Sequence, residues 1–280
     1  MPLAPLSMYL IDSHCHLDRF SDIDSVLDRS KSCGIHQWIS ISTSPITFKA
    51  LLPIVNQYDG VYGTVGLHPR EIHTLPEQDI EQWLQEGLQH PKIVGIGETG
   101  LDAQESSPPM DQQERCFRHH IRMAIETQLP LVVHTRNSDQ DFLSIMRDVR
   151  AASGGKTVKG VLHCFTGSVD CAKEAIDWGW KVSLSGIVTF KNAPDVHKLA
   201  TQLPLSALLV ETDAPWLAPT PYRGKDNEPA YMMETAKAMA ALRGCSLTDI
   251  ANATVQNTLE LFHKMPGMAA KDSRMSDGKF

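Results

Sequence analysis

The chain alternates short apolar runs with stretches of helical periodicity, and this alternation constrains its fold more than any other feature. Eight runs rich in aliphatic and β-branched residues are candidate strands, at 8–11, 37–41, 61–65, 93–96, 131–133, 158–162, 181–184 and 208–210. Between them, apolar residues recur at the three- and four-residue spacing of amphipathic helices, over 23–32, 80–88, 112–127, 141–152, 168–178 and 195–202. Strands that alternate with helices predict a parallel sheet.

Eight such units within residues 8–210 favour one closed (β/α)8 barrel over two domains. An open, doubly wound sheet is the structural alternative. That fold usually carries a glycine-rich phosphate-binding turn after its first strand, whereas this chain has His14-Cys15-His16 there. We therefore expect the α/β class, with a single (β/α)8 TIM barrel.

The sequence after the eighth candidate strand predicts extra helices at the C-terminus. Pro229 suits the first position of a helix, and Gly244 suits a helix stop. Ser246 through Asp249 resembles a capping box, which would open a helix that runs through Phe262. We expect the barrel and these helices to span residues 1–264, followed by a mobile tail over 265–280.

The bulk composition narrows the classes of protein. A net charge of −7 over 280 residues does not indicate a strongly basic nucleic-acid-binding surface. The six cysteines form no CxxC motif, so a disulfide framework is not expected. No segment approaches the roughly 18 apolar residues of a membrane span, and the N-terminus lacks a secretory signal. We predict a cytoplasmic protein with no membrane contact and no obligate protein partner.

Two histidines separated by one residue follow the first candidate strand. In extended backbone, residues i and i+2 share a face, so His14 and His16 can aim at one point while Cys15 faces away. Imidazole is a common ligand of zinc-like metals. The pair alone is a moderate signal, because histidines at this spacing are usually incidental.

Further polar residues stand at the ends of the other candidate strands. These residues are His68 after the third, Glu98 and Asp102 after the fourth, His134 after the fifth, His163 after the sixth and Asp213 after the eighth. In a (β/α)8 barrel the C-terminal strand ends meet at one face, which carries the active site. A lone histidine there is more often a hydrogen-bonded core residue, but packing does not explain the recurrence. The pattern predicts a metal centre.

The motifs around these residues resemble those of the TatD family of metal-dependent hydrolases, within the amidohydrolase-like superfamily. The matching segments are IDSHCHLD, VGLHP, IGETGLD, VVHTR, LHCFTGS, VETDAPWL and YRGKDNEP, followed by Asn257-Thr258. They cover nearly the whole chain to about Phe262, in the order of the family.

The resemblance implies a centre with two divalent metal ions. One ion would be bound by His14, His16 and Asp213, the other by His134 and His163, and Glu98 would bridge both. The metal stays open among zinc, magnesium and manganese, because histidines favour zinc whereas carboxylates also suit the other two.

The resemblance also implies hydrolysis of phosphodiester bonds in DNA, or in RNA, by a hydroxide that bridges the two metals. Asp213 would be the catalytic residue that orients the nucleophile and accepts its proton. A hydrolase of a small phosphoester, lactone or amide on the same centre is the alternative, because the ligand set does not distinguish them. A non-catalytic barrel with a structural metal is a third reading, disfavoured because structural zinc sites are usually closed by four ligands.

Three further residues are predicted to contact substrate, each with a structural alternative. His68 either touches substrate or supports a ligand. Arg136 either meets a phosphate or pairs with a structural carboxylate. Arg223, with Lys225, either forms a basic rim or only solvates the surface.

Other residues near the predicted centre receive structural or undecided roles. Trp216 and Tyr222 either stack on a base or pack their loop. Glu211, two residues before Asp213, is expected to hold a ligand histidine. Glu228 either fixes its loop or contacts substrate. The remaining histidines, His120 among them, are interpreted as ordinary surface or capping residues.

Overall fold

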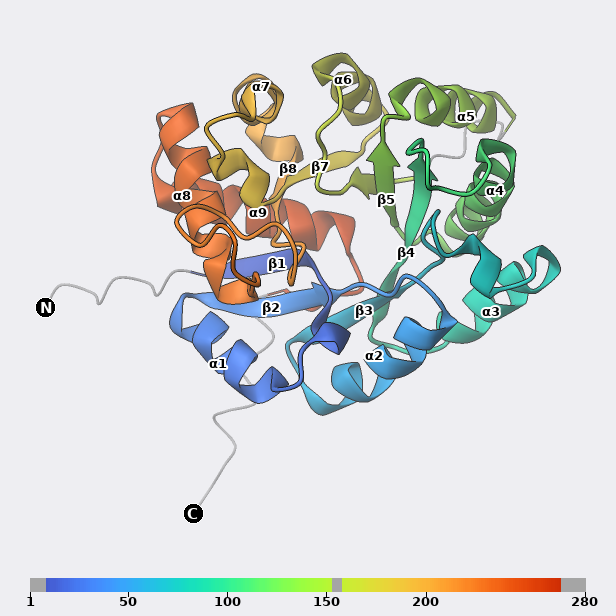
Figure 1. Cartoon of the computed structure of the whole chain (residues 1–280), viewed down its shortest axis with the longest axis horizontal. Coiled ribbons are helices and arrows are strands. Elements are labelled where there is room, and N and C mark those ends of the chain that lie inside the picture. The colour runs from blue at the N-terminus through green and yellow to red at the C-terminus, as the bar shows by residue number, and fades with distance from the viewer. Residues whose placement is uncertain (1–8, 153–157, 268–280) are drawn as a thin grey trace, which may run out of the picture.

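Eight parallel strands form one sheet in which each strand pairs with the next along the chain (Figure 1). The computed structural model describes residues 9–152 and 158–267. The strands are β1 (Leu10–Cys15), β2 (Ile35–Ser40), β3 (Val61–Val65), β4 (Ile93–Asp102), β5 (Leu131–Arg136), β6 (Gly160–Leu162), β7 (Lys181–Leu184) and β8 (Leu208–Val210). The predicted (β/α)8 barrel is confirmed. Strand bounds differ from the predicted ones mainly at β1, β4 and β5, which extend into the polar segments that follow the apolar runs.

Helices connect the strands and surround the sheet (Figure 1). They are α1 (Ile23–Ser32), α2 (Pro45–Gln57), α3 (Ile80–Gly87), α4 (Met110–Thr127), α5 (Asp139–Ala152), α6 (Val169–Asp177) and α7 (Pro194–Gln202). The sequence prediction omitted α2. Two prolines obscure this helix: Pro45 suits its first turn, whereas Pro53 lies inside and cannot donate a backbone hydrogen bond. A capping box of Ser44 and Thr47 nevertheless starts it.

Two further helices, α8 (Met232–Arg243) and α9 (Leu247–Leu261), follow the barrel as predicted. Gly244 ends α8 in a left-handed conformation, and Ser246 and Asp249 form the predicted capping box of α9. Of the segment expected to be a mobile tail, 268–280 lies outside the described residues, and Met265 is buried. In the described part of the chain, no helix is long and apolar enough to cross a membrane.

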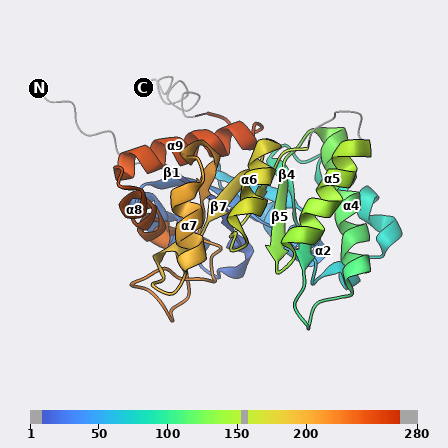
Figure 2. The same ribbon diagram turned by 90° about the horizontal axis from the view of Figure 1, so that it is seen from above.

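Helix α9 covers the N-terminal end of the barrel, and the loops after β4 and β8 project from the opposite end (Figure 2). Side chains from the barrel interior and from α9 form one buried apolar cluster: Ile11, Ile39, Ile41, Tyr62, Val94, Val132, Val161, Leu209, Val255, Leu261, Phe262 and Met265. The Asn257 side chain donates to the Leu205 and Leu208 carbonyls, at 2.9 and 2.8 Å, which fixes α9 to the start of β8. The predicted metal ligands lie at the opposite end, near the C-terminal ends of the strands.

The barrel closes between β1 and the residues that follow β8. The backbone N–H of Asp213 donates to the His14 carbonyl, and that of His16 donates to the Ala214 carbonyl, both at 2.9 Å. Asp213 adopts a left-handed conformation with φ of 56°, which aspartate tolerates better than most residues. Closure thus places the last acidic residue of the predicted centre beside the first two histidines.

A glycine immediately before Glu98 allows close contact between β4 and β5. Gly97 has φ of +146°, and a Cβ there would lie 2.4 Å from the Val132 carbonyl oxygen. We expect Gly97→Ala to lower the free energy of unfolding by about 1–3 kcal/mol, measured by urea denaturation. Gly179→Ala is the matched control, because Gly179 also has positive φ but nothing lies within 4 Å. Equal losses in the two variants would contradict the steric argument.

Candidate metal centre

All six predicted metal ligands lie together at the C-terminal end of the barrel. His14 lies in β1 and His16 directly after it, while Glu98 lies within β4 rather than after it. The others are His134 in β5, His163 directly after β6 and Asp213 after β8. Residues far apart in the sequence converge because parallel strands end at one face.

Glu98 lies at the centre of this cluster. Its Oε1 is 2.8 Å from His163 Nε2, 3.3 Å from His134 Nδ1 and 3.5 Å from His68 Nε2. Its Oε2 is 3.5 Å from His14 Nε2. Both carboxylate oxygens therefore face imidazole nitrogens, and they do so from different sides, as a bridging carboxylate requires.

Asp213 forms the second side of the cluster with the first two histidines. Its Oδ1 is 3.7 Å from His14 Nε2 and 3.5 Å from His16 Nε2, and these two nitrogens are 3.2 Å apart. Three overlapping groups have ligand atoms within 4.8 Å of one another: His14, His16 and Asp213; His14, Glu98 and His163; and His68, Glu98 and His134. Cys15 belongs to none of them, because its Sγ contacts the Ile39 carbonyl in the layer outside the barrel.

Three of the predicted ligand histidines have an oxygen acceptor near their second ring nitrogen. His16 Nδ1 lies 3.0 Å from the Ile41 carbonyl oxygen and donates to it. His134 Nε2 lies 3.3 Å from Asp102 Oδ2, and His163 Nδ1 lies 3.5 Å from Glu211 Oε1. Such acceptors hold the hydrogen of a neutral ring and leave the other nitrogen's lone pair for a metal. Glu211 thus lies beside one of the candidate ligand histidines.

His68 differs from these histidines, because a hydrogen-bond donor, not an acceptor, lies near its second ring nitrogen. The backbone N–H of Arg70 donates to His68 Nδ1 at 3.1 Å, so a neutral ring carries its hydrogen on Nε2. Burial lowers the pKa of His68 to about 3, which keeps the ring neutral, and nearby cations would lower it further. In this tautomer Nε2, which lies 3.5 Å from Glu98 Oε1, carries the hydrogen and has no lone pair for a metal. A hydrogen-bond donor in the cavity fits both alternatives for His68, contact with substrate and support of a ligand.

The charge balance of the cluster fits bound cations. Within the described residues, no lysine or arginine pairs with Glu98 or Asp213, and their ionic partners are imidazoles. Burial would raise the pKa of Glu98, but the charge of the His163 imidazole, with hydrogen bonds from His134 and His14, outweighs that effect and holds the pKa well below its usual value. Buried ionised carboxylates require compensating positive charge, and this donor set of histidine nitrogens and carboxylate oxygens suits divalent metals.

A buried carboxyl that the sequence prediction missed supports the junction of β1 and β8. Asp12 Oδ1 accepts from the Thr212 and His14 backbone N–H groups, at 3.0 and 3.3 Å, and Oδ2 accepts from the Thr212 hydroxyl at 2.6 Å. Burial raises the pKa of Asp12 to about 8, although these hydrogen bonds oppose the shift. Asp12 therefore fixes the backbone next to both His14 and Asp213. In the sequence, the only indication of this supporting role is the position of Asp12 two residues before His14.

The interpretation of His120 as a surface or capping residue is wrong. His120 lies on α4 and is fully buried. Its Nδ1–H donates to the Cys116 carbonyl at 2.8 Å, and its Nε2 accepts from the Leu67 backbone N–H at 3.0 Å. It therefore holds the backbone directly before His68. Helical periodicity alone could not reveal this role, because it depends on a contact between α4 and the loop after β3.

The basic residues predicted to contact substrate are exposed around the same face. Arg136 forms no ion pair with any carboxylate in the described ranges, so the structural alternative for it lacks support. The guanidinium of Arg223 lies 3.7 Å from the centroid of the Phe190 ring, where it packs the loop after β8 against the loop after β7. Tyr222 stacks on Tyr231 at 3.8 Å, so its ring packs the loop.

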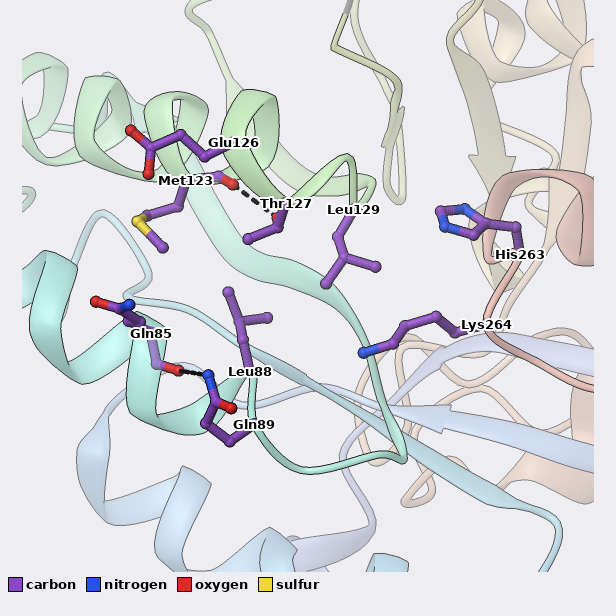
Figure 3. A pocket seen from close by; sticks show the side chains of 9 residues that line it. All are labelled: Gln85, Leu88, Gln89, Met123, Glu126, Thr127, Leu129, His263 and Lys264. Atoms are coloured by element: carbon purple, nitrogen blue, oxygen red, sulfur yellow. Dashed lines mark hydrogen bonds between the residues drawn. The ribbon is translucent and has the colours of Figure 1, made fainter.

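A surface pocket lies away from this centre, at the N-terminal end of β4 and β5 (Figure 3). It has a volume of about 420 Å³, and Leu88, Met123 and Leu129 form its apolar part. The amino group of Lys264 donates to the Ile93 carbonyl at 3.1 Å beside it. None of the six predicted metal ligands lines this pocket, so it is distinct from the candidate metal centre.

Comparisons with known proteins agree with this fold and with a metal-dependent hydrolase. The family described as TatD related DNase matches residues 11–263. YcfH of Escherichia coli, named an uncharacterized metal-dependent hydrolase, is 37% identical over 262 residues, covering 91% of this chain and 96% of YcfH. YabD of Bacillus subtilis, with the same description, is 34% identical over 256 residues, covering 90% and 98%.

The fold also matches solved structures. The crystal structure of YjjV, a TatD homologue from Escherichia coli, superposes with a TM-score of 0.85 at 27% identity, covering 93% of this chain and all of that one. A TatD family hydrolase from Entamoeba histolytica has the same fold, with a TM-score of 0.78 at 22% identity. Fold, ligand cluster and relatives together define a metal-dependent hydrolase built on a (β/α)8 barrel. Within that class, the chain belongs to the TatD family.

Proposed function

We propose that this protein hydrolyses phosphodiester bonds of DNA on a centre that holds two divalent metal ions. The observation that carries the proposal is the position of Glu98, whose two oxygens face separate groups of histidines. One group adjoins Asp213, and the other is backed by Asp102 and Glu211. The matching family's description as TatD related DNase supports DNA as the substrate.

The reaction requires an activated water and neutralised charge on the phosphoryl oxygens. Two divalent cations held there would supply both, by lowering the pKa of water and by acting as Lewis acids. The water oxygen forms a bond to phosphorus while the bond from phosphorus to the leaving oxygen breaks. Asp213, whose side chain is 15% exposed, accepts the proton of the water. The leaving alkoxide takes a proton from solvent.

His68 would donate a hydrogen bond to a phosphoryl oxygen through Nε2–H. We expect His68→Leu to lower kcat about 10²-fold, because one such donor is worth that much to a transition state. The metal content of the purified variant should stay at the wild-type value, since in this tautomer neither ring nitrogen of His68 offers a lone pair to a metal. His68→Gln, which keeps a side-chain donor, should recover part of the rate. A loss of metal in His68→Leu would instead make His68 a ligand.

The proposed activity is tested with end-labelled single-stranded DNA, single-stranded RNA and a set of small phosphoesters, lactones and amides. Protein is stripped of metal and then loaded with Zn²⁺, Mn²⁺ or Mg²⁺. Cleavage of DNA that depends on metal and stops with EDTA supports the proposal. Turnover of only the small substrates would replace it with the alternative hydrolase on the same centre.

A further inference from the structure

One large aromatic side chain is exposed beside the candidate metal centre. Trp216 is 47% exposed, and its ring lies edge to face with His16, with the ring centroids 4.8 Å apart. Among the described residues, the other large exposed apolar side chains are Ile46 and Leu242, neither of which is aromatic. Nearly half of the Trp216 surface therefore stays accessible to a ligand beside the candidate metal centre.

The backbone of Trp216 is held firmly although its ring is exposed. Its N–H donates to the Asp213 carbonyl at 2.9 Å, and its own carbonyl accepts from the Asn227 side chain at 2.6 Å. Asn227 is 1% exposed and also donates to the Thr212 carbonyl at 2.8 Å. The ring is therefore presented from the same short segment that carries Asp213.

The loop between Asp213 and Asn227 is anchored on both sides. On one side, Arg29 of α1 donates from Nε and Nη2 to the Glu228 carboxylate at 2.9 and 2.6 Å. On the other, the Thr220 N–H donates to the Thr189 hydroxyl at 2.8 Å. Gly186 allows close approach there, since a Cβ would lie 2.2 Å from the Leu217 carbonyl oxygen. Of the alternatives for Glu228, the structure supports fixing the loop.

We propose that Trp216 is a stacking platform for a nucleobase of the substrate, next to the phosphate that lies at the metal centre. This inference rests on the proposed phosphodiesterase activity and names a subsite of the same centre. Every base has a π-face, so a rigid indole ring binds any base with little sequence preference. Because the ring adjoins His16 and shares its segment with Asp213, a base stacked on it is fixed relative to the reacting phosphate.

The test compares two matched substrates: single-stranded oligonucleotides with a complete set of bases, and the same oligonucleotides with abasic residues near the cleaved bond. With complete DNA, Trp216→Ala should raise KM about 10- to 100-fold, the usual value of one stacked base. With the abasic substrate, the wild type should already show the raised KM, and Trp216→Ala should add nothing. Trp216→Phe should stay near the wild type.

The control variant is Ile46→Ala, which removes an exposed apolar side chain at the start of α2 and should leave both substrates unchanged. An equal rise of KM on complete and abasic DNA would overturn the stacking platform while the phosphodiesterase activity stands. An unchanged KM in Trp216→Ala would overturn it equally. If the wild-type protein cleaves no oligonucleotide and only small esters, the proposed function and this subsite both fail.

Discussion

Glu98→Gln should reduce metal-dependent hydrolysis at least about 10³-fold, because metal ions supply several kcal/mol of transition-state stabilisation and 1.36 kcal/mol corresponds to tenfold in rate. Glutamine has nearly the shape of glutamate but no negative charge. Its amide nitrogen would also face one of the imidazole nitrogens that now lie 2.8 to 3.5 Å from the carboxylate. We therefore expect the variant to bind less metal per chain than the wild type, as measured by elemental analysis.

The matched control is Glu105→Gln, an exposed carboxylate in the loop after the same strand. It removes the same charge from an exposed position and should keep both metal content and rate. Thermal unfolding of the metal-free proteins separates loss of a metal ligand from loss of the fold. If only metal binding is lost, metal-free Glu98→Gln and the metal-free wild type should unfold at similar temperatures. A Glu98→Gln variant with full metal content and full activity would remove Glu98 from the centre.

The barrel could be predicted from sequence because the patterns of its strands and of its helices are both local. The strands are short apolar runs, and most helices have an amphipathic spacing of apolar residues that can be recognised without knowing the tertiary structure. Helix α2 was missed for a local reason as well, since Pro45 and Pro53 suggest loops. The extent of β4 could not be predicted, because its polar end from Glu98 to Asp102 is extended only through pairing with β5.

The positions of the candidate ligands could be predicted because barrel strands end at one face, but the groups that orient them could not. Asp12 contacts Thr212, 200 residues away, and His120 contacts Leu67, 53 residues away. No spacing in the sequence encodes such pairs. The different behaviour of His68 depends on a single backbone N–H, that of Arg70, which points at its Nδ1. That contact places the hydrogen of a neutral His68 ring on Nε2, so this histidine differs from the candidate metal ligands.

Asp213→Asn should lower kcat about 10²- to 10⁴-fold, the usual contribution of a general base. The substitution is well suited to this position. Asparagine tolerates the left-handed backbone that residue 213 adopts, with φ of 56°. The hydrogen bonds of its backbone N–H to His14 and of its carbonyl to Trp216 do not involve the side chain. The fold of the loop should therefore be kept while the ability to accept a proton is lost.

Asparagine also keeps one side-chain oxygen beside His14 and His16, whose Nε2 atoms lie 3.7 and 3.5 Å from Asp213 Oδ1. A variant that retains most of its metal but loses kcat, with little change in KM, would identify Asp213 as the proton acceptor. Loss of metal and rate together would make it chiefly a ligand, and unchanged kcat would exclude both roles. Asp226→Asn, an exposed carboxylate of the same loop, is the control and should behave as the wild type. Glu98 and Asp213 both lie near His14 Nε2, at 3.5 and 3.7 Å, so comparing the metal content and kcat of the two variants separates loss of metal from loss of proton transfer.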